Sequence, residues 1–368
     1  MDLQFAYWVP NVSGGLVTST IPQRTDWSFD YNRRLALTAE VAGFDYALAQ
    51  ARFFASYGAD KQLEAVTTAT ALAVVTSRLQ LIAAVHPGLW NPAVIANVIA
   101  SANVISDGRV SLNVVSGWFK DEYTGFGEEW LEHDERYVRS EEFIRVLKGM
   151  WTQERTTLHG KYHTITDVPC EPKPISKPHP TIFQGGNSIA AREMAARVTD
   201  VLFLNGGTVE KIAETIADVR ERARKYGREN EIRFAMNAFV IARDTEEEAL
   251  EVLREIVAGA NVEAVKGFGE AVKEAGQASP EGEGMWSNSS FEDLVQYNDG
   301  FKPRLIGTPD GIAARIQEYE AVGVDILLTG FLHFIEEVER FGWTVIPRVR
   351  ALPSERAPQP AGGAATVR

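Results

Sequence analysis

The sequence predicts an α/β fold, a TIM (β/α)8 barrel with insertions after its fourth and seventh strands. Two observations support this prediction. Short apolar runs alternate with helical stretches from end to end, which is typical of a parallel sheet buried on both faces. Eight such strand–helix units over roughly 330 residues fit a barrel with insertions. An open Rossmann-like sheet is the alternative, but no GxGxxG motif follows the first strand.

Each element of the barrel has its own signal in the sequence. The predicted strands are Leu3–Trp8, Asp45–Ala49, Leu79–Val85, Arg109–Val115, Thr181–Gln184, Val201–Leu204, Ile232–Ala242 and Val324–Leu328. The predicted helices are Tyr31–Ala42, Asp60–Val75, one starting near Pro92, His133–Trp151, Ile189–Arg197, Val209–Tyr226, Thr245–Ala258 and Ile335–Phe341. Gly43 and Gly323 lie where helices should end in a left-handed cap before a strand. A hairpin is expected over Thr156–Thr166.

Two long segments interrupt this alternation. Ser116–Leu131 is rich in aromatic residues and glycine, and Asn261–Leu305 is rich in glycine, glutamate and serine. Long loops at the C-terminal face of a barrel usually form lids or substrate walls, which is the role we expect for both. Residues 1–352 are predicted to form a single domain. The proline-rich residues 353–368 are predicted to be an extended or disordered tail.

The composition excludes several classes of function. Hydrophobic residues make up 45% of the 368 residues, and the net charge of −13 argues against nucleic acid or an anionic membrane as a partner. The only cysteine is Cys170, and the N-terminus lacks the pattern of a signal peptide, so a cytoplasmic location is expected. No apolar run reaches the roughly 18 residues of a membrane helix. Of the six histidines only His159 and His163 lie close together in the sequence, in the predicted hairpin, and no metal site is expected.

The turn Gly185-Gly186-Asn187-Ser188 is the most informative segment for function. Two glycines follow the fifth predicted strand, and Asn187 and Ser188 are good N-cap residues for the next helix. The free N–H groups and the dipole of a helix N-terminus bind anions, and glycine lets a phosphate approach the backbone. An ordinary strand-to-helix turn is the alternative. Its place at the mouth of the predicted barrel favours a phosphate site.

Three further residues are candidates for the same site. Asn113 lies within an apolar strand, where an unpaired amide costs a few kcal/mol. It could bond to backbone in the core, or it could bind the polar edge of a heterocyclic ligand. His133 and Tyr137 share one face of the predicted helix, and both can donate to an anion, although capping or surface roles remain open.

As a set, four segments resemble the bacterial luciferase-like family of flavin-dependent monooxygenases. They are Leu112–Gly117, His133–Tyr137, Pro180–Ser188 and Ile306–Asp310, and the resemblance runs over about residues 3–350. It implies a barrel that uses reduced FMN (FMNH2) and O2, with the flavin supplied by a separate NAD(P)H-dependent FMN reductase. It also implies a homodimer or homotetramer.

The resemblance implies roles for individual residues. Gly186, Asn187 and Ser188 would hold the FMN phosphate, with His133 and Tyr137 beside it. Asn113 would meet the isoalloxazine ring, and Ala84 and Ser116 would line its site. The candidates for the substrate pocket are Trp8, Phe53, Phe239 and Phe331, and the candidate catalytic residues are His333, Asn237 and Arg304.

The substrate is expected to be a small, neutral organosulfur compound. Alkanesulfonate enzymes of this family carry Arg and His in the seventh strand, where this chain has Asn237 and Phe239. Arginines bind a sulfonate anion, so their loss favours an uncharged sulfone. We therefore expect oxidation of dimethyl sulfone to methanesulfinate and formaldehyde. The alternatives are an alkanesulfonate or methanesulfonate monooxygenase, a dehydrogenase of the same fold that uses the deazaflavin F420, and a flavin- or phosphate-binding barrel without catalysis.

Overall fold

The chain folds into a closed barrel of eight parallel strands, which confirms the predicted TIM barrel. The computed structural model describes residues 2–53, 55, 58–277, 279–280, 286, 288–354 and 356. Around the barrel the strands follow chain order, and β12 pairs with β1 to close it. The barrel strands are β1 (Gln4–Val9), β2 (Tyr46–Ala49), β3 (Gln80–Val85), β4 (Val110–Val114), β7 (Ile182–Gly185), β8 (Val201–Leu204), β9 (Arg233–Phe239) and β12 (Ile326–Gly330).

Each of the eight predicted strands is present, with one change. The predicted strand Ile232–Ala242 is divided, because its last two residues form β10 (Ile241–Ala242), which pairs with β11 (Ile306–Gly307) outside the barrel. The predicted hairpin is confirmed as β5 (Arg155–His159) and β6 (Thr164–Pro169).

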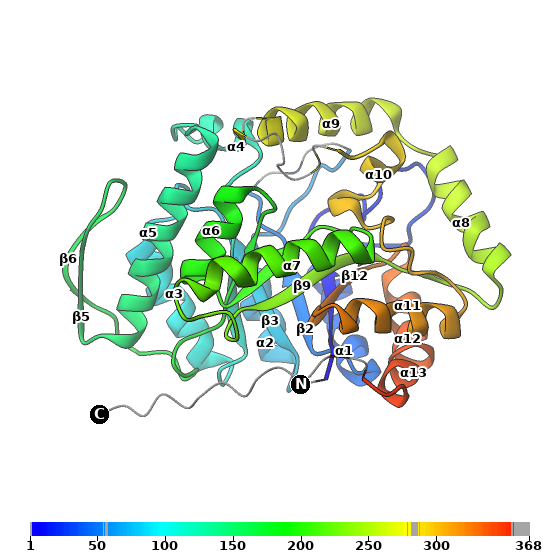
Figure 1. Cartoon of the computed structure of the whole chain (residues 1–368), viewed down its shortest axis with the longest axis horizontal. Coiled ribbons are helices and arrows are strands. Elements are labelled where there is room, and N and C mark those ends of the chain that lie inside the picture. Colours follow the sequence, from blue (N-terminus) through cyan, green and yellow to red (C-terminus); the bar gives the residue numbers. More distant parts are fainter. Residues whose placement is uncertain are drawn as a thin grey trace.

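Most of the helices cover the outside of the barrel, and others lie over one of its ends (Figure 1). They are α1 (Phe29–Ala42), α2 (Ala65–Val75), α3 (Pro92–Ile105), α4 (Lys120–Gly125), α5 (His133–Thr152), α6 (Ile189–Val198), α7 (Val209–Arg224), α8 (Glu246–Ala258), α9 (Val262–Gln277), α10 (Phe291–Val295), η1 (Tyr297–Asp299), α11 (Pro309–Ala321), α12 (Phe334–Thr344) and α13 (Ile346–Ala351). The prediction that the second helix starts at Asp60 is wrong. It starts at Ala65, because the Glu64 side chain caps it by accepting from two backbone N–H groups. Gly43 does adopt the expected left-handed cap, with φ 93°.

Side chains alternate between the barrel interior and the helical layer. The interior is filled by apolar residues, with the Phe183 and Phe203 rings stacked 5.3 Å apart. Its members are Ala6, Leu48, Ile82, Phe183, Val201, Phe203, Ala235, Ile326 and Leu328. The interior of the barrel is therefore a packed core, and only the C-terminal end of the barrel is left for a site.

The segments predicted as lids lie at that C-terminal end. Figure 1 places α4, α9 and α10 together over one end of the barrel, opposite the end that carries the N-terminus. α4 belongs to the segment Ser116–Leu131, and α9, α10 and η1 belong to Asn261–Leu305. The sequence did not predict α9 or α11.

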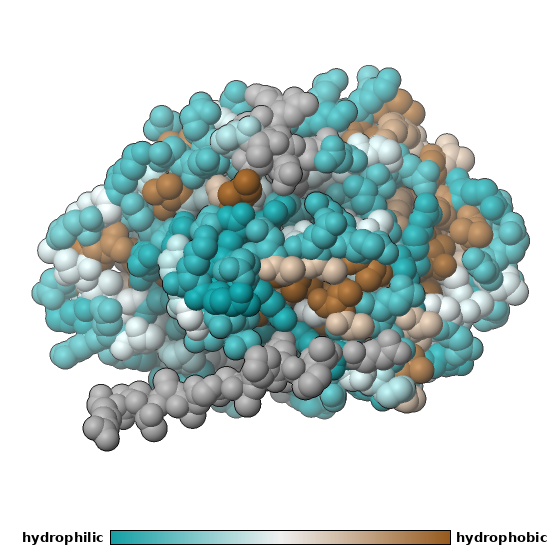
Figure 2. Space-filling model, viewed as in Figure 1, coloured by the Kyte–Doolittle hydropathy of each residue, from teal (hydrophilic) through white to brown (hydrophobic). Residues whose placement is uncertain are grey.

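The outer surface and the chain end show features that lie outside the barrel core. The face over α5, α6 and α7 is mostly hydrophilic (Figure 2), in keeping with the net charge of −13. Within the described residues, we found no helix whose length and apolar character would let it cross a bilayer. Arg356 pairs with Asp325 beneath the barrel at 2.8 Å. The rest of the predicted tail, residues 355 and 357–368, lies outside the described residues.

Candidate active site

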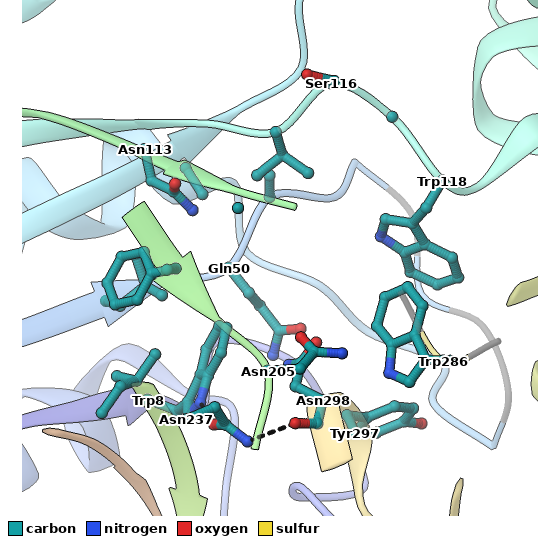
Figure 3. A pocket seen from close by; sticks show the side chains of 18 of the residues that line it. Trp8, Gln50, Asn113, Ser116, Trp118, Asn205, Asn237, Trp286, Tyr297 and Asn298 are labelled. Atoms are coloured by element: carbon teal, nitrogen blue, oxygen red, sulfur yellow. Dashed lines mark hydrogen bonds between the residues drawn. The ribbon is translucent and has the colours of Figure 1, made fainter. Parts of the chain in front are cut away.

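A cavity opens at the C-terminal end of the barrel (Figure 3). It holds about 1290 Å³ of space that no protein atom fills, part of it open to solvent. Residues from the ends of the barrel strands, from α5 and from the two lid segments line it. Seven of the predicted site residues are among them: Trp8, Ala84, Asn113, Ser116, His133, Tyr137 and Asn237.

The glycine turn between β7 and α6 is built for close approach. Gly185 lines the cavity, and Gly186 has φ 144°. A Cβ on Gly186 would lie 2.7 Å from the Ala191 Cβ and 3.0 Å from the Tyr137 hydroxyl oxygen. Only glycine therefore fits there. The turn also places Tyr137 of α5 directly beside the N-terminus of α6.

The two residues after Gly186 carry different polar groups. Ser188 is the N-cap of α6, as predicted, and its side chain accepts from the Ala191 N–H. The Asn187 Oδ1 is buried and has no hydrogen-bond partner among the described residues. A buried amide oxygen without a partner is costly, so this side chain is suited to a bound ligand.

α5 brings a histidine, a tyrosine and an arginine to the same end of the cavity. The His133 and Tyr137 rings lie 5.2 Å apart, and the His133 Nδ1 lies 2.7 Å from an oxygen of Asp134. Arg136, which the sequence analysis missed, is 3% exposed and donates from Nη1 to the Gly117 carbonyl at 2.6 Å. Its spacing of three from His133 was the signal that could have revealed it.

The Arg136 guanidinium is a buried cation with unused donors. Its Nε and Nη2 have no hydrogen-bond partner among the described residues, and it lies 4.4 Å from the Trp130 ring centroid. Burial lowers its pKa from the ordinary value. A buried guanidinium that lacks a carboxylate is stabilised by an anionic ligand.

The β3–β4 side of the cavity offers a surface for a flat ring. Ala84 and Asn113 pair across the two strands, and both face the cavity. Asn113 is 6% exposed, and its Oδ1 has no partner, which also holds for the Ser116 Oγ among the described residues. At this oxygen, therefore, Asn113 does not form the backbone hydrogen bond that was the alternative to ligand binding.

Asn237 is bonded differently from the way its predicted catalytic role requires. Its Oδ1 accepts from the Trp8 Nε1 at 2.7 Å, and its Nδ2 donates to the Asn298 carbonyl at 3.0 Å (Figure 3). That carbonyl also accepts from the Gly206 N–H at 2.9 Å. Because the Oδ1 and one N–H of the Nδ2 are used within the protein, Asn237 orders the cavity wall, and its catalytic role stays a prediction.

The other two catalytic candidates lie elsewhere. Neither His333 nor Arg304 is among the residues that line the cavity. The His333 Nδ1 lies 2.8 Å from the Gln23 carbonyl oxygen, and Arg304 is exposed in a left-handed conformation with φ 58°. The catalytic roles expected for these two residues therefore stay predictions, and neither side chain lines the cavity.

Three of the four predicted pocket aromatics are also outside the lining. Phe53 is 38% exposed and packs on Trp90 and Phe126. Phe331 comes directly after the inward-facing end of β12, so it points outward into the helical layer. There its ring packs in edge contact against Phe334.

Phe239 is separated from the cavity by the end of the second lid segment. Its backbone N–H donates to the Gly300 carbonyl at 2.8 Å, and its ring packs against Phe301 with centroids 5.3 Å apart. The chain around Gly300 therefore covers the end of β9. The alternation of side chains along β9 could not reveal this, because the covering residues follow Phe239 by about 60 positions in the sequence.

The lid segments supply walls that the sequence analysis did not assign to single residues. Trp118 lies in edge contact with Phe268 at 5.7 Å and with Trp286 at 5.9 Å, and Phe268 lies 5.0 Å from the Tyr297 ring. Gln50, Asn205 and Asn298 add amide groups beside these rings (Figure 3). No Asp or Glu is among the described lining residues.

The cavity thus has two chemically different ends. At one end Gly185 and Arg136 line the cavity, while Gly186, Asn187 and Ser188 lie next to Gly185 outside the lining. Together with the α6 N-terminus these groups can hold a phosphate, and at Asn113 a strand surface can receive a polar ring edge. At the other end an aromatic chamber with neutral amides can receive a small apolar molecule with hydrogen-bond acceptors. FMN would suit the first end, because the unpartnered N–H groups of Arg136 would donate to its phosphate and the unpartnered Asn113 Oδ1 would accept from its ring edge.

Comparisons with known proteins show the family and the fold of the chain. The family model for luciferase-like monooxygenases matches residues 3–326. The chain is 58% identical over 354 residues to an FMNH2-dependent dimethylsulfone monooxygenase of Pseudomonas putida, covering 96% of this chain and 97% of the relative. It is 56% identical over 350 residues to the enzyme of the same name from Pseudomonas fluorescens strain Pf0-1, covering 95% of both. The riboflavin lyase RcaE has the same fold, with a TM-score of 0.81, 20% identity and coverage of 95% and 92%.

Proposed function

The chain belongs to the luciferase-like monooxygenase family, and on that premise we propose that it is the monooxygenase that cleaves dimethyl sulfone with reduced FMN and O2. That the enzyme is an FMNH2-dependent monooxygenase follows from its near full-length relatives. The observation that carries the choice of substrate is the 58% identity, over 96% of this chain, to a dimethylsulfone enzyme. The absence of carboxylates from the described lining is compatible with a neutral substrate.

The phosphate of FMN is proposed to sit on the turn Gly185–Ser188 at the N-terminus of α6. Gly186 allows the close approach, Asn187 would donate from its amide Nδ2, and the positive end of the helix favours the anion. Arg136 provides positive charge from α5, with His133 and Tyr137 beside it. The isoalloxazine edge is proposed to meet the unpartnered Asn113 oxygen, over the small side chain of Ala84.

The reaction balances with one O2 and two electrons. Reduced flavin supplies the two electrons that activate O2. One oxygen atom enters a C–H bond of a sulfone methyl group, and the other leaves as water. The C–S bond to the oxidised carbon then breaks, which gives formaldehyde and methanesulfinate. The residues of the chain contribute by excluding water and by holding the methyl carbon near the ring, the role that the aromatic lid residues suit.

Oxygen uptake with a generic FMN reductase tests this proposal. Dimethyl sulfone should stimulate uptake, and formaldehyde and methanesulfinate should form in equal amounts. Activity that depends on F420 instead of FMN would point to the dehydrogenase alternative. Flavin binding without sulfone-dependent oxygen uptake would support the alternative of a flavin-binding barrel without catalysis.

An alkanesulfonate substrate is the second candidate, and one residue favours it. Arg52 lines the cavity, and its guanidinium lies 4.7 Å from the Trp118 ring centroid. A cation in this position can bind a sulfonate. Turnover of methanesulfonate but not of dimethyl sulfone in the same assay would select this candidate and reject the first.

Two partners complete the proposal. A separate NAD(P)H-dependent reductase supplies the reduced flavin, and both enzymes are proposed to work in the cytoplasm. A second copy of the chain is proposed to pack on α2 and α3, whose apolar surface includes Val74, 65% exposed, and Ile105, 62% exposed. Light scattering of the purified protein checks this, and a monomeric mass would contradict it.

A further inference from the structure

Unpartnered hydrogen-bond donors form two separate groups in the cavity. Near α5 and β4 they are the Arg136 guanidinium and the Ser116 hydroxyl, which lie at the proposed flavin end. At the lid end they are the Gln50 Nε2 and the Trp286 Nε1. Both atoms are buried and have no hydrogen-bond partner among the described residues.

Trp286 is held as a rigid wall by its ring contacts. It is 7% exposed and packs at 61° against Trp118 and at 75° against Phe268. The backbone of Trp286 has φ 64°, a conformation that costs energy for a residue with a side chain. A buried indole N–H usually finds a partner, so its lack of one marks a place for a ligand acceptor.

Gln50 follows β2 and is anchored through its backbone. Its N–H donates to the Asn11 Oδ1 at 3.2 Å, and its carbonyl accepts from the Asn11 Nδ2 at 3.2 Å. This fixes where the side chain starts, while the amide itself points into the cavity beside Asn205 (Figure 3). The Gln50 Nε2 is thus a positioned donor whose acceptor is not supplied by the described residues.

We propose that Gln50 and Trp286 bind the two sulfonyl oxygens of the substrate, each through one N–H donor. The inference rests on the proposed function and extends it to the residues that recognise the sulfone. Sulfonyl oxygens only accept hydrogen bonds and carry no net charge, so neutral N–H donors match them. The methyl groups would then face the rings of Trp118, Phe268 and Tyr297.

This arrangement also gives a reason for specificity. A site with two fixed donors loses much of its binding energy when the ligand lacks the acceptors, because the donors are then buried without partners. A thioether of the same size, which has no sulfonyl oxygen, should therefore bind far more weakly than the sulfone.

The test uses two variants and binding of dimethyl sulfone itself to the full-length protein loaded with oxidised FMN. Trp286→Phe keeps a ring but removes the N–H, and Gln50→Glu keeps the shape but replaces the donor with a carboxylate. We expect the dissociation constant for dimethyl sulfone to rise about tenfold in each, the scale of one lost hydrogen bond. Affinity for FMN should stay within twofold, and Trp343→Phe, at an exposed tryptophan of α12, should change neither value.

The outcomes separate the two proposals. Unchanged sulfone binding in both variants would overturn the assignment of Gln50 and Trp286. A parallel loss of FMN affinity and of melting temperature would overturn it too, since that pattern indicates a structural role. Sulfone binding that both variants weaken, in an enzyme that does not turn over the sulfone, would support the assignment and reject the proposed reaction.

Discussion

Two asparagines on different sides of the barrel mouth differ in how their amides are used. Asn113 of β4 and Asn237 of β9 are both buried, and both line the cavity. Asn237 is bonded at both ends, to the Trp8 indole and to the Asn298 carbonyl. Asn113 has an oxygen with no partner among the described residues.

Residue type and strand position therefore do not decide the role of a buried amide. The β9 side is joined by hydrogen bonds to β1 and to the second lid segment, so its amide contributes to the stability of the free protein. The β4 side leaves the Asn113 oxygen unpaired, which costs free energy in the free protein. A bound ligand that donates a hydrogen bond can offset this cost. Substitutions on the β9 side should therefore lower the stability of the free protein, whereas substitutions on the β4 side should lower the affinity for the ligand.

The largest effect is expected for Asn237→Leu. This change leaves the Trp8 Nε1 without its acceptor and removes one of the two donors to the Asn298 carbonyl. We expect the free energy of unfolding to fall by about 3 kcal/mol, the scale of buried polar groups left unpaired. Urea denaturation of the flavin-free protein measures this. A loss below about 0.5 kcal/mol would mean that the network is not structural.

Trp8→Phe probes the same network from its other side. It keeps an aromatic ring in β1 but leaves the Asn237 Oδ1 without a donor, so a loss of about 2 kcal/mol is expected. The double variant with Asn237→Leu should lose less stability than the sum of the two single losses, because both substitutions remove the same hydrogen bond. Strict additivity in the same urea experiment would contradict the shared bond.

Asn113→Leu should show the opposite pattern. Its oxygen has no partner to lose, so the stability of the flavin-free protein should stay within about 1 kcal/mol. The affinity for FMN should fall about tenfold, which corresponds to about 1.4 kcal/mol. Fluorescence titration of FMN measures the affinity. Loss of stability without loss of affinity would mean that Asn113 has a structural role like that of Asn237.

Asn103→Leu is a matched control for this change. Asn103 of α3 is fully buried outside the cavity, donates to the Val110 carbonyl and accepts from the Ile175 N–H. Its replacement should destabilise the protein without a specific effect on FMN. Together the three asparagine variants separate an amide that serves the fold from one that serves a ligand.

The sequence could predict the barrel because the signal is local and repeated. Strands buried on both faces, such as Leu79–Val85, read as nearly continuous apolar runs, and cap residues such as Gly43 mark the ends of the helices between them. The Gly186 turn was predictable for the same reason, since its glycine and cap requirements involve neighbouring residues. These features need no knowledge of distant contacts.

The substrate end could not be predicted because its contacts are distant in the sequence. The bond from Trp8 to Asn237 joins residues 229 positions apart, and Phe239 is covered by a segment near Gly300. The family resemblance placed Phe239 and Phe331 in the pocket, whereas packing buries both away from it. The role of Gln50 and Trp286 depends on which donors are left unpaired, a property of the folded network alone.

The smallest effect is expected for Ser188→Ala at the flavin end. The Ser188 side chain accepts from the Ala191 N–H, so its removal loosens the first turn of α6 and costs about 1 kcal/mol. Because the free N–H groups of that turn are proposed to face the phosphate, affinity for FMN should fall about fivefold. Thr208→Ala is the matched control, since Thr208 caps α7 by accepting from the Lys211 N–H. An equal fall in FMN affinity in both variants would assign the effect to general destabilisation, whereas a fall confined to Ser188→Ala would locate the phosphate at α6.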